Sequence, residues 1–379
     1  LIYILMILVL TIFMFNNVGI AENNWYQRAD QTQDALEENY WNEDIKSYNL
    51  DSEEESREQF FHYWWHAHAL DNLVDAYLRT KDSKYEEKID TLYEGILQRN
   101  KGQITNDYYD DMLWMGLALL RAYQITEKEE YKDSVLELWE EIKGGWNDHC
   151  QGGIAWRKQQ LDYKNTPANG PAVILAARLY REFGKKEYLE WAEKIFSWLD
   201  ENLVDQNTGF VWDGKNREGK GKIDKDWQFT YNQGVYIGAA VELFKITEEI
   251  NFLEKADKTA DTAMVRLTLP GENIIQDEGQ EDGGLFKGIY VRYLTKLIVT
   301  LAKTKTEQEF NYKEYIEHLE INAESAWGKS RNEKGIFNND WTEKTDTKID
   351  LSTNLSGVFL MEVMAVLEEK NLLNGGGIK

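Results

Sequence analysis

The chain has 379 residues, with 43 Lys and Arg against 67 Asp and Glu, so its formal net charge is −24 at pH 7. A composition of 42% hydrophobic and 29% charged residues is that of a globular protein and excludes disorder over most of the length. Binding to DNA or to an anionic membrane surface is excluded as well, because such binding needs clustered Lys and Arg. A single cysteine, Cys150, excludes a disulfide framework and every multi-cysteine metal site.

Residues 1–15 (LIYILMILVLTIFMF) form an uncharged apolar segment. It is short for a membrane span, which needs about 20 residues, and fits the apolar region of a signal peptide. Gly19 and Ala21 are small residues before a cleavage site, so we expect residues 1–21 to be removed and a secreted protein to begin at Glu22. An uncleaved anchor is the alternative, and no cysteine follows that could carry a lipid. A secreted chain with one cysteine is typical of a bacterial protein.

From residue 25 onward, two kinds of predicted helix alternate. Six segments are apolar nearly all round, as buried helices are: residues 59–80, 107–126, 166–184, 228–247, 283–303 and 350–370. Six others are charged and amphipathic, with apolar residues at three- and four-residue spacing: residues 25–41, 84–99, 128–143, 185–203, 248–265 and 307–325. This repeat predicts an all-α fold, an (α/α)6 toroid of six helical hairpins, with an open solenoid of helical pairs as the alternative.

The connections between these segments are unequal. Those that lead from a buried to an amphipathic segment are short, whereas those in the other direction are long, aromatic and glycine-rich, at residues 144–165, 204–227, 266–282 and 326–349. In an alternating ring all long loops lie at one end, beside the N-termini of the inner helices, so we expect the functional site there. No Pro/Ser-rich linker interrupts the chain, which predicts one domain over residues 22–370 and a flexible tail over 371–379.

Asp110 and Asp111 begin the second buried segment (DYYDDMLW, residues 107–114). Capping accounts for Asp107 as the N-cap and for Asp110 in the first turn, where the helix dipole favours an acid. Capping does not account for Asp111, because a carboxylate that faces an apolar interior is costly without a partner. Two adjacent carboxylates repel, so one pKa should rise while the other stays low, as a glycosidase requires of its acid and its nucleophile. The pair is therefore either catalytic or a capping feature.

Aromatic and amide side chains gather at the same predicted end. Flat indole faces suit the C–H faces of a sugar, and amides both donate and accept hydrogen bonds, as a polyhydroxyl ligand requires. Each polar residue also has a capping or turn explanation. The candidate binding residues are Trp64, Trp65, Tyr109, Trp156, Lys164, Asn165, Asn169, Tyr231, Asn232, Gln233 and Lys287.

Metal and phosphate sites are not expected. His62 and His66 have the spacing of a zinc pair but lack a third ligand. Residues 214–221 (GKNREGKG) lack the Ser or Thr and the following helix of a phosphate-binding loop. Asp205 begins a stretch that is similar to a calcium loop, but the distal Glu is missing and an Asx-turn is the simpler explanation. We therefore predict no metal and no cofactor, with calcium near Asp205 as the open alternative.

Five motifs of the chain resemble glycoside hydrolase family 76, the bacterial and fungal endo-α-1,6-mannanases and their relatives. They are Tyr63-Trp64-Trp65 with His68-Ala69-Leu70-Asp71, Tyr109-Asp110-Asp111-Met112, Gly152-Gly153-Ile154-Ala155-Trp156, Asn165-Thr166 with Ala168-Asn169-Gly170-Pro171, and Tyr231-Asn232-Gln233-Gly234. The resemblance implies an (α/α)6 toroid, hydrolysis with retention of configuration, and catalysis by the aspartate pair. Asp110 would be the nucleophile and Asp111 the general acid/base.

The expected function is a secreted, monomeric, retaining glycoside hydrolase of endo type whose partner is an α-1,6-linked mannan or a related glycan. No nucleic acid and no stable membrane insertion are expected. One alternative is a cell-wall transglycosylase, and another is a sugar epimerase, whose chemistry depends on histidines, although only His149 lies in a long loop. A non-catalytic glycan-binding or scaffold protein is a third, and it would keep its affinity for sugar after Asp→Asn replacement of Asp110 or Asp111.

Overall fold

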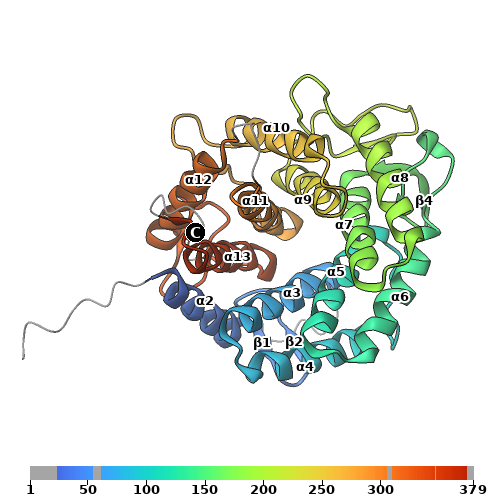
Figure 1. Cartoon of the computed structure of the whole chain (residues 1–379). Helices are drawn as coiled ribbons and strands as arrows, with labels where there is room; N and C mark the ends of the chain where they lie inside the picture. Colours follow the sequence, from blue (N-terminus) through green and yellow to red (C-terminus); the bar gives the residue numbers. More distant parts are fainter. Residues whose placement is uncertain (1–23, 54–60, 305–309, 346, 374–379) are drawn as a thin grey trace, which may run out of the picture.

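The computed structural model describes residues 24–53, 61–304, 310–345 and 347–373. Twelve α-helices within these ranges form two concentric rings (Figure 1). The predicted signal peptide, residues 1–21, and most of the predicted tail, residues 374–379, lie outside the described residues. Leu372 and Leu373, which we expected to be flexible, are buried against the core.

The inner ring consists of the six segments predicted to be buried. They are α3 (Tyr63–Thr80), α5 (Tyr109–Thr126), α7 (Thr166–Phe183), α9 (Thr230–Thr247), α11 (Phe286–Leu301) and α13 (Leu351–Glu369). Each of them packs on the next and α13 packs on α3, so the ring is closed. This closure confirms the (α/α)6 toroid and excludes the open solenoid. Helix α13 is apolar and long enough to cross a membrane, but most of it is buried inside the ring.

The outer ring consists of the six amphipathic segments. They are α2 (Trp25–Tyr40), α4 (Ser83–Arg99), α6 (Glu129–Lys143), α8 (Lys186–Leu203), α10 (Ile250–Arg266) and α12 (Tyr312–Ser325). Helix α2 packs on α13, and each of the others packs on the inner helix that precedes it. Only one face of an outer helix is buried: in α8 this face carries Tyr188, Ala192, Ile195 and Leu199, at the spacing that a helical period requires.

Four inner helices end in the same short turn. Lys81, Glu127, Gly184 and Glu248 follow α3, α5, α7 and α9, and each adopts a left-handed conformation with φ between 56° and 70°. The N–H of each donates to the carbonyl of the fourth residue before it, which satisfies the helix end and reverses the chain at once. The turns to the outer helices are thereby kept short, and the long loops lie at the opposite end of the ring.

The long loops contain strands that the all-α prediction did not include. β3 (Ala155–Arg157), β4 (Gln160–Asn165) and β5 (Gly214–Lys215) form an antiparallel sheet in which Ala155 pairs with Lys164 and Lys164 with Lys215. β1 (Trp41–Asn42) and β2 (Ser47–Tyr48) form a small hairpin between α2 and α3. Long loops need partners for their backbone N–H and C=O groups, and these sheets supply them.

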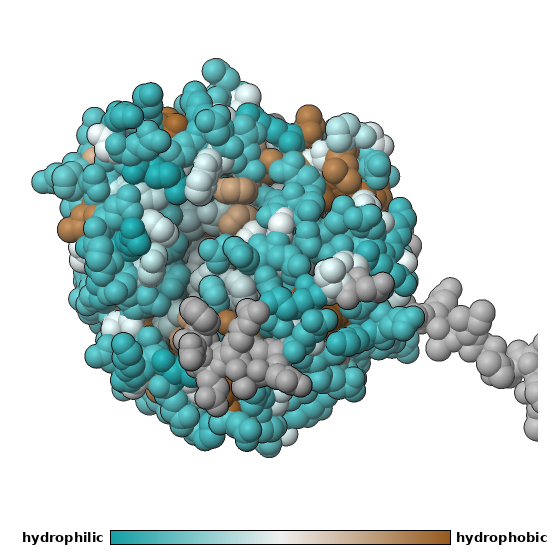
Figure 2. All heavy atoms as spheres, turned by 180° about the vertical axis from the view of Figure 1, so that it is seen from behind, coloured by the Kyte–Doolittle hydropathy of each residue, from teal (hydrophilic) through white to brown (hydrophobic). Residues whose placement is uncertain are grey.

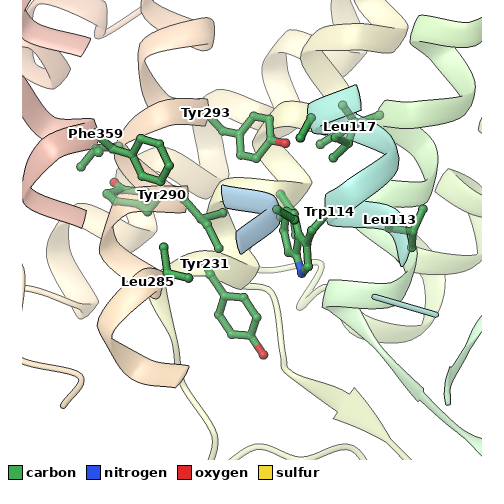
Figure 3. Packing of buried hydrophobic residues seen from close by; sticks show 14 of the residues in the cluster. Leu113, Trp114, Leu117, Tyr231, Leu285, Tyr290, Tyr293 and Phe359 are labelled. Carbon is green, nitrogen blue, oxygen red and sulfur yellow. The ribbon is translucent and has the colours of Figure 1, made fainter. Parts of the chain in front are cut away.

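Aromatic and aliphatic side chains from the inner helices fill the centre of the ring (Figure 3). Trp114 of α5, Tyr231 of α9, Tyr290 of α11 and Phe359 of α13 are all buried there. The indole nitrogen of Trp114 and the hydroxyl of Tyr231 point in the same direction, out of the apolar cluster. These two polar atoms mark the side of the core on which the cavity described below lies.

Candidate active site

A cavity of about 730 Å³ opens at the long-loop end of the ring. Residues at the N-termini of inner helices and in the long loops between the rings line it. Figure 2 shows the face opposite to that of Figure 1, which is hollowed near its middle and mostly hydrophilic around the hollow. The volume is typical of a site for a small molecule or for a short stretch of a polymer.

Asp110 and Asp111 line this cavity from the first turn of α5. Oδ2 of Asp110 accepts a hydrogen bond from Nε1 of Trp156 at 3.1 Å, and Oδ1 accepts the N–H of Asp111, also at 3.1 Å. Oδ2 of Asp111 accepts a hydrogen bond from the side-chain amide of Asn106 at 3.0 Å. Within the part of the chain that the structure describes, neither carboxylate forms an ion pair with Lys or Arg.

Both carboxyl groups of the pair have a raised pKa. Burial raises the pKa of Asp110 to about 7, although the hydrogen bonds from Trp156 and from the Asp111 N–H act in the other direction. Burial, together with the negative charges of Asp110 and Asp282, raises the pKa of Asp111 well above its ordinary value. Since more influences favour the neutral form of Asp111, we assign it the proton when the pair carries only one.

The start of α5 differs from the prediction. Tyr108, not Asp107, is the N-cap, so the helix begins one residue later than an Asp107 cap would require. Asp107 is exposed, and the Asn106 side chain accepts the N–H of Tyr108 at 3.1 Å. The prediction that Asp107 caps the helix is therefore wrong, because an Asn one residue earlier makes the local turn. Asp110 and Asp111 both remain in the first helical turn, where the helix dipole favours negative charge.

A third carboxylate, Asp282, lines the cavity from η2 (Glu281–Leu285), the 3-10 helix before α11. Its Oδ1 accepts hydrogen bonds from Nε1 of Trp64 at 3.0 Å and from Nε1 of Trp65 at 3.3 Å. Trp64 lines the cavity, whereas Trp65 is only 3% exposed and is not among the lining residues. Asp282 thus fixes both indoles, and only Trp64 presents its ring to a ligand.

Asp213 is held by four donors at the base of the α8–α9 loop. Its Oδ1 accepts the hydroxyl of Tyr231 at 2.7 Å and the amide of Asn232 at 3.2 Å. Its Oδ2 accepts Nη2 of Arg217 at 2.7 Å and the hydroxyl of Tyr163 at 3.1 Å. Tyr231 lines the cavity, but the Asn232 side chain does not reach it. Asp213 therefore joins β4, the α8–α9 loop and the N-terminus of α9 into one wall.

Glu278 supplies the cap that α9 lacks. The N-cap of this helix, Phe229, has no capping side chain. Instead, Oε1 of Glu278 accepts the N–H of Thr230 at 2.8 Å and Oε2 accepts its hydroxyl. Burial raises the pKa of Glu278 to about 7. Asp213, Glu278 and Asp282 are not among the residues predicted from the sequence, because each contacts a helix or an indole that is distant along the chain.

The structure brings only part of the predicted site together. Of the predicted residues, those that line the cavity are Trp64, Asp110, Asp111, Trp156, Asn165 and Tyr231. Those that the structure places outside its lining are Trp65, Tyr109, Lys164, Asn169, Asn232, Gln233 and Lys287. Most residues of the second group form hydrogen bonds with the backbone of the long loops and do not face the cavity.

Three of these polar residues form hydrogen bonds with the backbone of the loops around the cavity. Asn169 bonds both backbone groups of Ile154, at 2.8 and 3.0 Å, and Gln233 bonds both backbone groups of Val211, at 2.9 and 2.7 Å. The ammonium of Lys164 is buried and donates to a loop carbonyl at 2.8 Å. Each side chain therefore fixes a loop around the cavity, which is a supporting role.

The remaining two predicted residues are also occupied elsewhere. The Nζ of Lys287 donates to the carbonyl of Asn339 and lies 4.2 Å from the centre of the Trp341 ring. Tyr109 is 5% exposed, and its neighbour Tyr108 lines the cavity in its place. Because helix direction at the N-terminus decides which of two adjacent tyrosines faces the site, the sequence alone could not choose between them.

The weak metal candidates bond to the backbone. The two ring nitrogens of His66 lie 2.8 and 3.0 Å from the carbonyl oxygens of His62 and Tyr48. Oδ1 of Asp205 accepts the N–H groups of Asn207 and Thr208, which is an Asx-turn. In the ranges that the structure describes, no group of three or more His, Cys, Asp or Glu side chains could hold a metal ion.

Comparison with known proteins gives matches over nearly the whole chain. The profile of glycosyl hydrolase family 76 matches residues 24–375. Mannan endo-1,6-alpha-mannosidase DCW1 of Candida albicans is 26% identical over 338 residues, which cover 80% of this chain and 73% of that protein. The DCW1 protein of Candida glabrata is 28% identical over 205 residues, 49% of this chain and 46% of that protein. The chain thus spans about half the length of several curated relatives that it matches.

A solved structure matches more completely. It is an inactive variant of the alpha-1,6-mannanase GH76A of Salegentibacter, with two consecutive aspartates replaced by alanine, in complex with alpha-1,6-mannotetrose. The TM-score is 0.85 at 40% identity, and the match covers 91% of this chain and 99% of that one. A family 76 mannosidase of Bacteroides thetaiotaomicron, 20% identical with a TM-score of 0.80, shares the fold.

Proposed function

Because the chain belongs to glycosyl hydrolase family 76, we propose that it is a retaining glycoside hydrolase that cleaves α-1,6-linked mannan by endo action. The observation that carries this proposal is the adjacent pair Asp110 and Asp111 in the wall of the cavity, both with a raised pKa. The Salegentibacter α-1,6-mannanase, which is 40% identical, is inactive when two consecutive aspartates are replaced. This parallel supports the pair as the catalytic residues.

In the proposed reaction, a carboxylate oxygen of Asp110 attacks the anomeric carbon and forms a glycosyl ester. The bond from that carbon to the glycosidic oxygen breaks, and Asp111 gives its proton to the departing oxygen. Water then attacks the anomeric carbon from the face opposite to Asp110, Asp111 takes a proton from the water, and the bond to the ester oxygen breaks, which releases Asp110 as the carboxylate. Two inversions give an α-anomeric product. The hydrogen bonds from Trp156 and from the Asp111 N–H support Asp110 as the anion.

The charge of the cavity favours a neutral glycan. Its described lining includes six acidic residues and one guanidinium, that of Arg217, which Asp213 and Asp224 already bind. A glycan that carries carboxylate or sulfate groups would be repelled, whereas mannose presents hydroxyl groups that donate to carboxylates. Trp64 and Trp156 use their N–H groups on carboxylates, which orients the ring faces for C–H contacts with a sugar.

We further propose that residues 22–370 form the catalytic domain of a monomer that is secreted after cleavage behind Ala21, without stable insertion in a membrane. The uncharged apolar residues 1–15 support this localisation. N-terminal sequencing of secreted protein that begins at Glu22 is the expected outcome, and retention of Leu1 would contradict it.

The test of the activity is the release of reducing ends from a panel of defined α-mannans. We expect release from α-1,6-linked mannan and not from α-1,2- or α-1,3-linked mannan, and NMR should detect the α-anomer first. The double variant Asp110→Asn/Asp111→Asn serves as the inactive control. Products longer than the substrate would show transglycosylation, and a β-anomer as the first product would contradict the proposed mechanism.

A further inference from the structure

One large apolar side chain stands out at the rim of the cavity. The exposed large hydrophobic residues of the described part of the chain are Tyr26, Leu78, Leu161, Trp227 and Val265, and only Trp227 lines the cavity. This residue is 45% exposed. Exposure of so much indole surface forgoes the free energy of burial, and a ligand that covers the ring would recover it.

The guanidinium of Arg217 supports the ring of Trp227. The Cζ atom of Arg217 lies 3.6 Å from its centroid, and Asp213 and Asp224 fix this guanidinium at 2.7 and 3.0 Å. Phe229 meets the indole edge to face, with centroids 5.9 Å apart and an angle of 75°. Arg217 and Phe229 therefore fix the orientation of the indole, and the exposed part of Trp227 is available to a ligand in the cavity.

A chain of contacts connects Trp227 to the aspartate pair. Trp156 donates to Asp110, and its ring centroid lies 5.9 Å from that of Tyr163. Arg217 then bridges Tyr163, at 4.6 Å from its centroid, and Trp227. Asp110 begins α5 and Trp227 precedes α9, and α7 lies between these two helices in the inner ring. We therefore expect a ligand that contacts both residues to be an oligosaccharide rather than a single pyranose.

We propose that Trp227 is a remote sugar-binding platform, which stacks on the C–H face of a neutral pyranose at least one unit away from the bond that is cleaved. Arg217 is a positioning residue that fixes the orientation of the indole. This inference rests on the proposed function, since it assigns a second contact point for the same α-1,6-linked glycan. It predicts that affinity rises with the length of the oligosaccharide once a unit reaches Trp227.

The test is calorimetric binding of α-1,6-linked mannotriose to mannohexaose to the Asp110→Asn/Asp111→Asn protein, which binds without turnover. Trp227→Ala and Trp227→Phe are compared in this background. Leu161→Ala is the matched control, because Leu161 is 42% exposed and lies outside the cavity lining. Thermal melting checks that all variants are folded.

We expect the gain in affinity from the shortest to the longest ligand to fall about tenfold in Trp227→Ala, by analogy with the loss of other stacked flat ligands. Trp227→Phe should keep most of the gain, since it keeps an aromatic face. Leu161→Ala should keep all of it. Kd ratios in Trp227→Ala that equal those of the parent protein would overturn the inference, and so would an equal loss for every length, which would place Trp227 beside the cleaved bond.

The two proposals fail in different ways. If the wild-type protein releases sugars from α-1,6-mannan while Trp227→Ala shows an unchanged length dependence, only the platform is refuted. If the wild-type protein cleaves no α-1,6-mannan and its Asn/Asn variant binds no oligosaccharide of any length, the proposed function is refuted and the platform with it.

Discussion

At the short-loop end of the inner ring, Glu242 of α9 forms ion pairs with Arg178 at 3.0 Å, Arg181 at 3.0 Å and Lys245 at 3.5 Å. These cations outweigh burial and lower its pKa to about 2. At the long-loop end, Asp110 is also largely buried but receives only neutral N–H donors, and its pKa rises to about 7. The two carboxylates differ in their cationic neighbours, not in the fold element that carries them.

Asp71 of α3 is a second buried carboxylate whose pKa is lowered by neighbouring cations. It lies between Arg121 and Arg292, and their positive charges hold its pKa well below its usual range despite burial. The ring therefore supports two kinds of buried carboxylate. Glu242 and Asp71, which are paired with arginine, stabilise the fold as ions, whereas Asp110 and Asp111 keep a proton available for transfer and cost stability when they ionise.

The largest effect is expected from Asp→Asn replacement in the cavity. Asp110→Asn should lower kcat on mannan by on the order of 10⁴-fold or more, because no ester can form, and Asp111→Asn by about 10²–10⁴-fold, because the acid is lost. Azide should restore turnover of Asp111→Asn on a substrate with a good leaving group, and the product should be the α-azide. Kinetics with Glu193→Gln, which replaces an exposed residue of α8, provide the control. Failure of azide to restore turnover of Asp111→Asn would contradict this assignment of roles.

Glu242→Gln tests the other end of the comparison. Loss of the carboxylate leaves Arg178, whose side chain is only 12% exposed, without compensation. The free energy of unfolding should fall by about 3–5 kcal/mol. Denaturant unfolding at pH 7 measures this change against Glu193→Gln. A decrease in the free energy of unfolding that is no larger than that of Glu193→Gln would show that the Glu242 carboxylate does not stabilise the fold.

The stability difference between the wild type and Glu242→Gln should decrease as the pH falls. The folded-state pKa of Glu242, about 2, lies below that of an unfolded Glu, so its contribution is present above the unfolded value and is lost as the pH falls toward 2. The difference between wild type and Glu242→Gln should therefore shrink as unfolding is measured at progressively lower pH.

A smaller stability change of opposite sign is expected for Asp110→Asn. The folded-state pKa of Asp110, about 7, lies above the unfolded value, so ionisation destabilises the native protein as the pH rises from about 4 to 7. The variant escapes this cost and should be about 0.5–2 kcal/mol more stable than the wild type at pH 8. At pH 4 the difference should disappear. A variant that is less stable at pH 8 would show that the Asp110 carboxylate stabilises the fold.

The smallest effect concerns the coupling across the cavity. The negative charge of Asp282 helps to raise the pKa of both Asp110 and Asp111. Asp282→Asn should therefore shift both limbs of the pH profile of kcat/KM to lower pH, by about 0.5–1 unit. The position of the limbs is the measurement, because the loss of bonds to Trp64 and Trp65 would lower the rate without moving them. An unmoved or upward-shifted profile would contradict the coupling.

Much of the fold was determined by the sequence itself. Helix periodicity is a local property, so the alternation of all-apolar and amphipathic segments predicted both rings in chain order. The aspartate pair could also be recognised from local sequence, because capping does not explain a second carboxylate, Asp111, in the first turn of an apolar helix. Unequal loop lengths then placed the site at one end.

Only the tertiary structure decided which polar side chains reach the cavity. Asn165 and Asn169 stand four residues apart at the same helix start, yet Asn165 lines the cavity and Asn169 binds the backbone of Ile154. The third carboxylate, Asp282, comes from a loop far along the chain. Electrostatic interactions and backbone hydrogen bonds depend on distance in space, whereas a sequence gives distance along the chain. The chain order of residues therefore predicted the scaffold, and the folding of the long loops over one end completed the site.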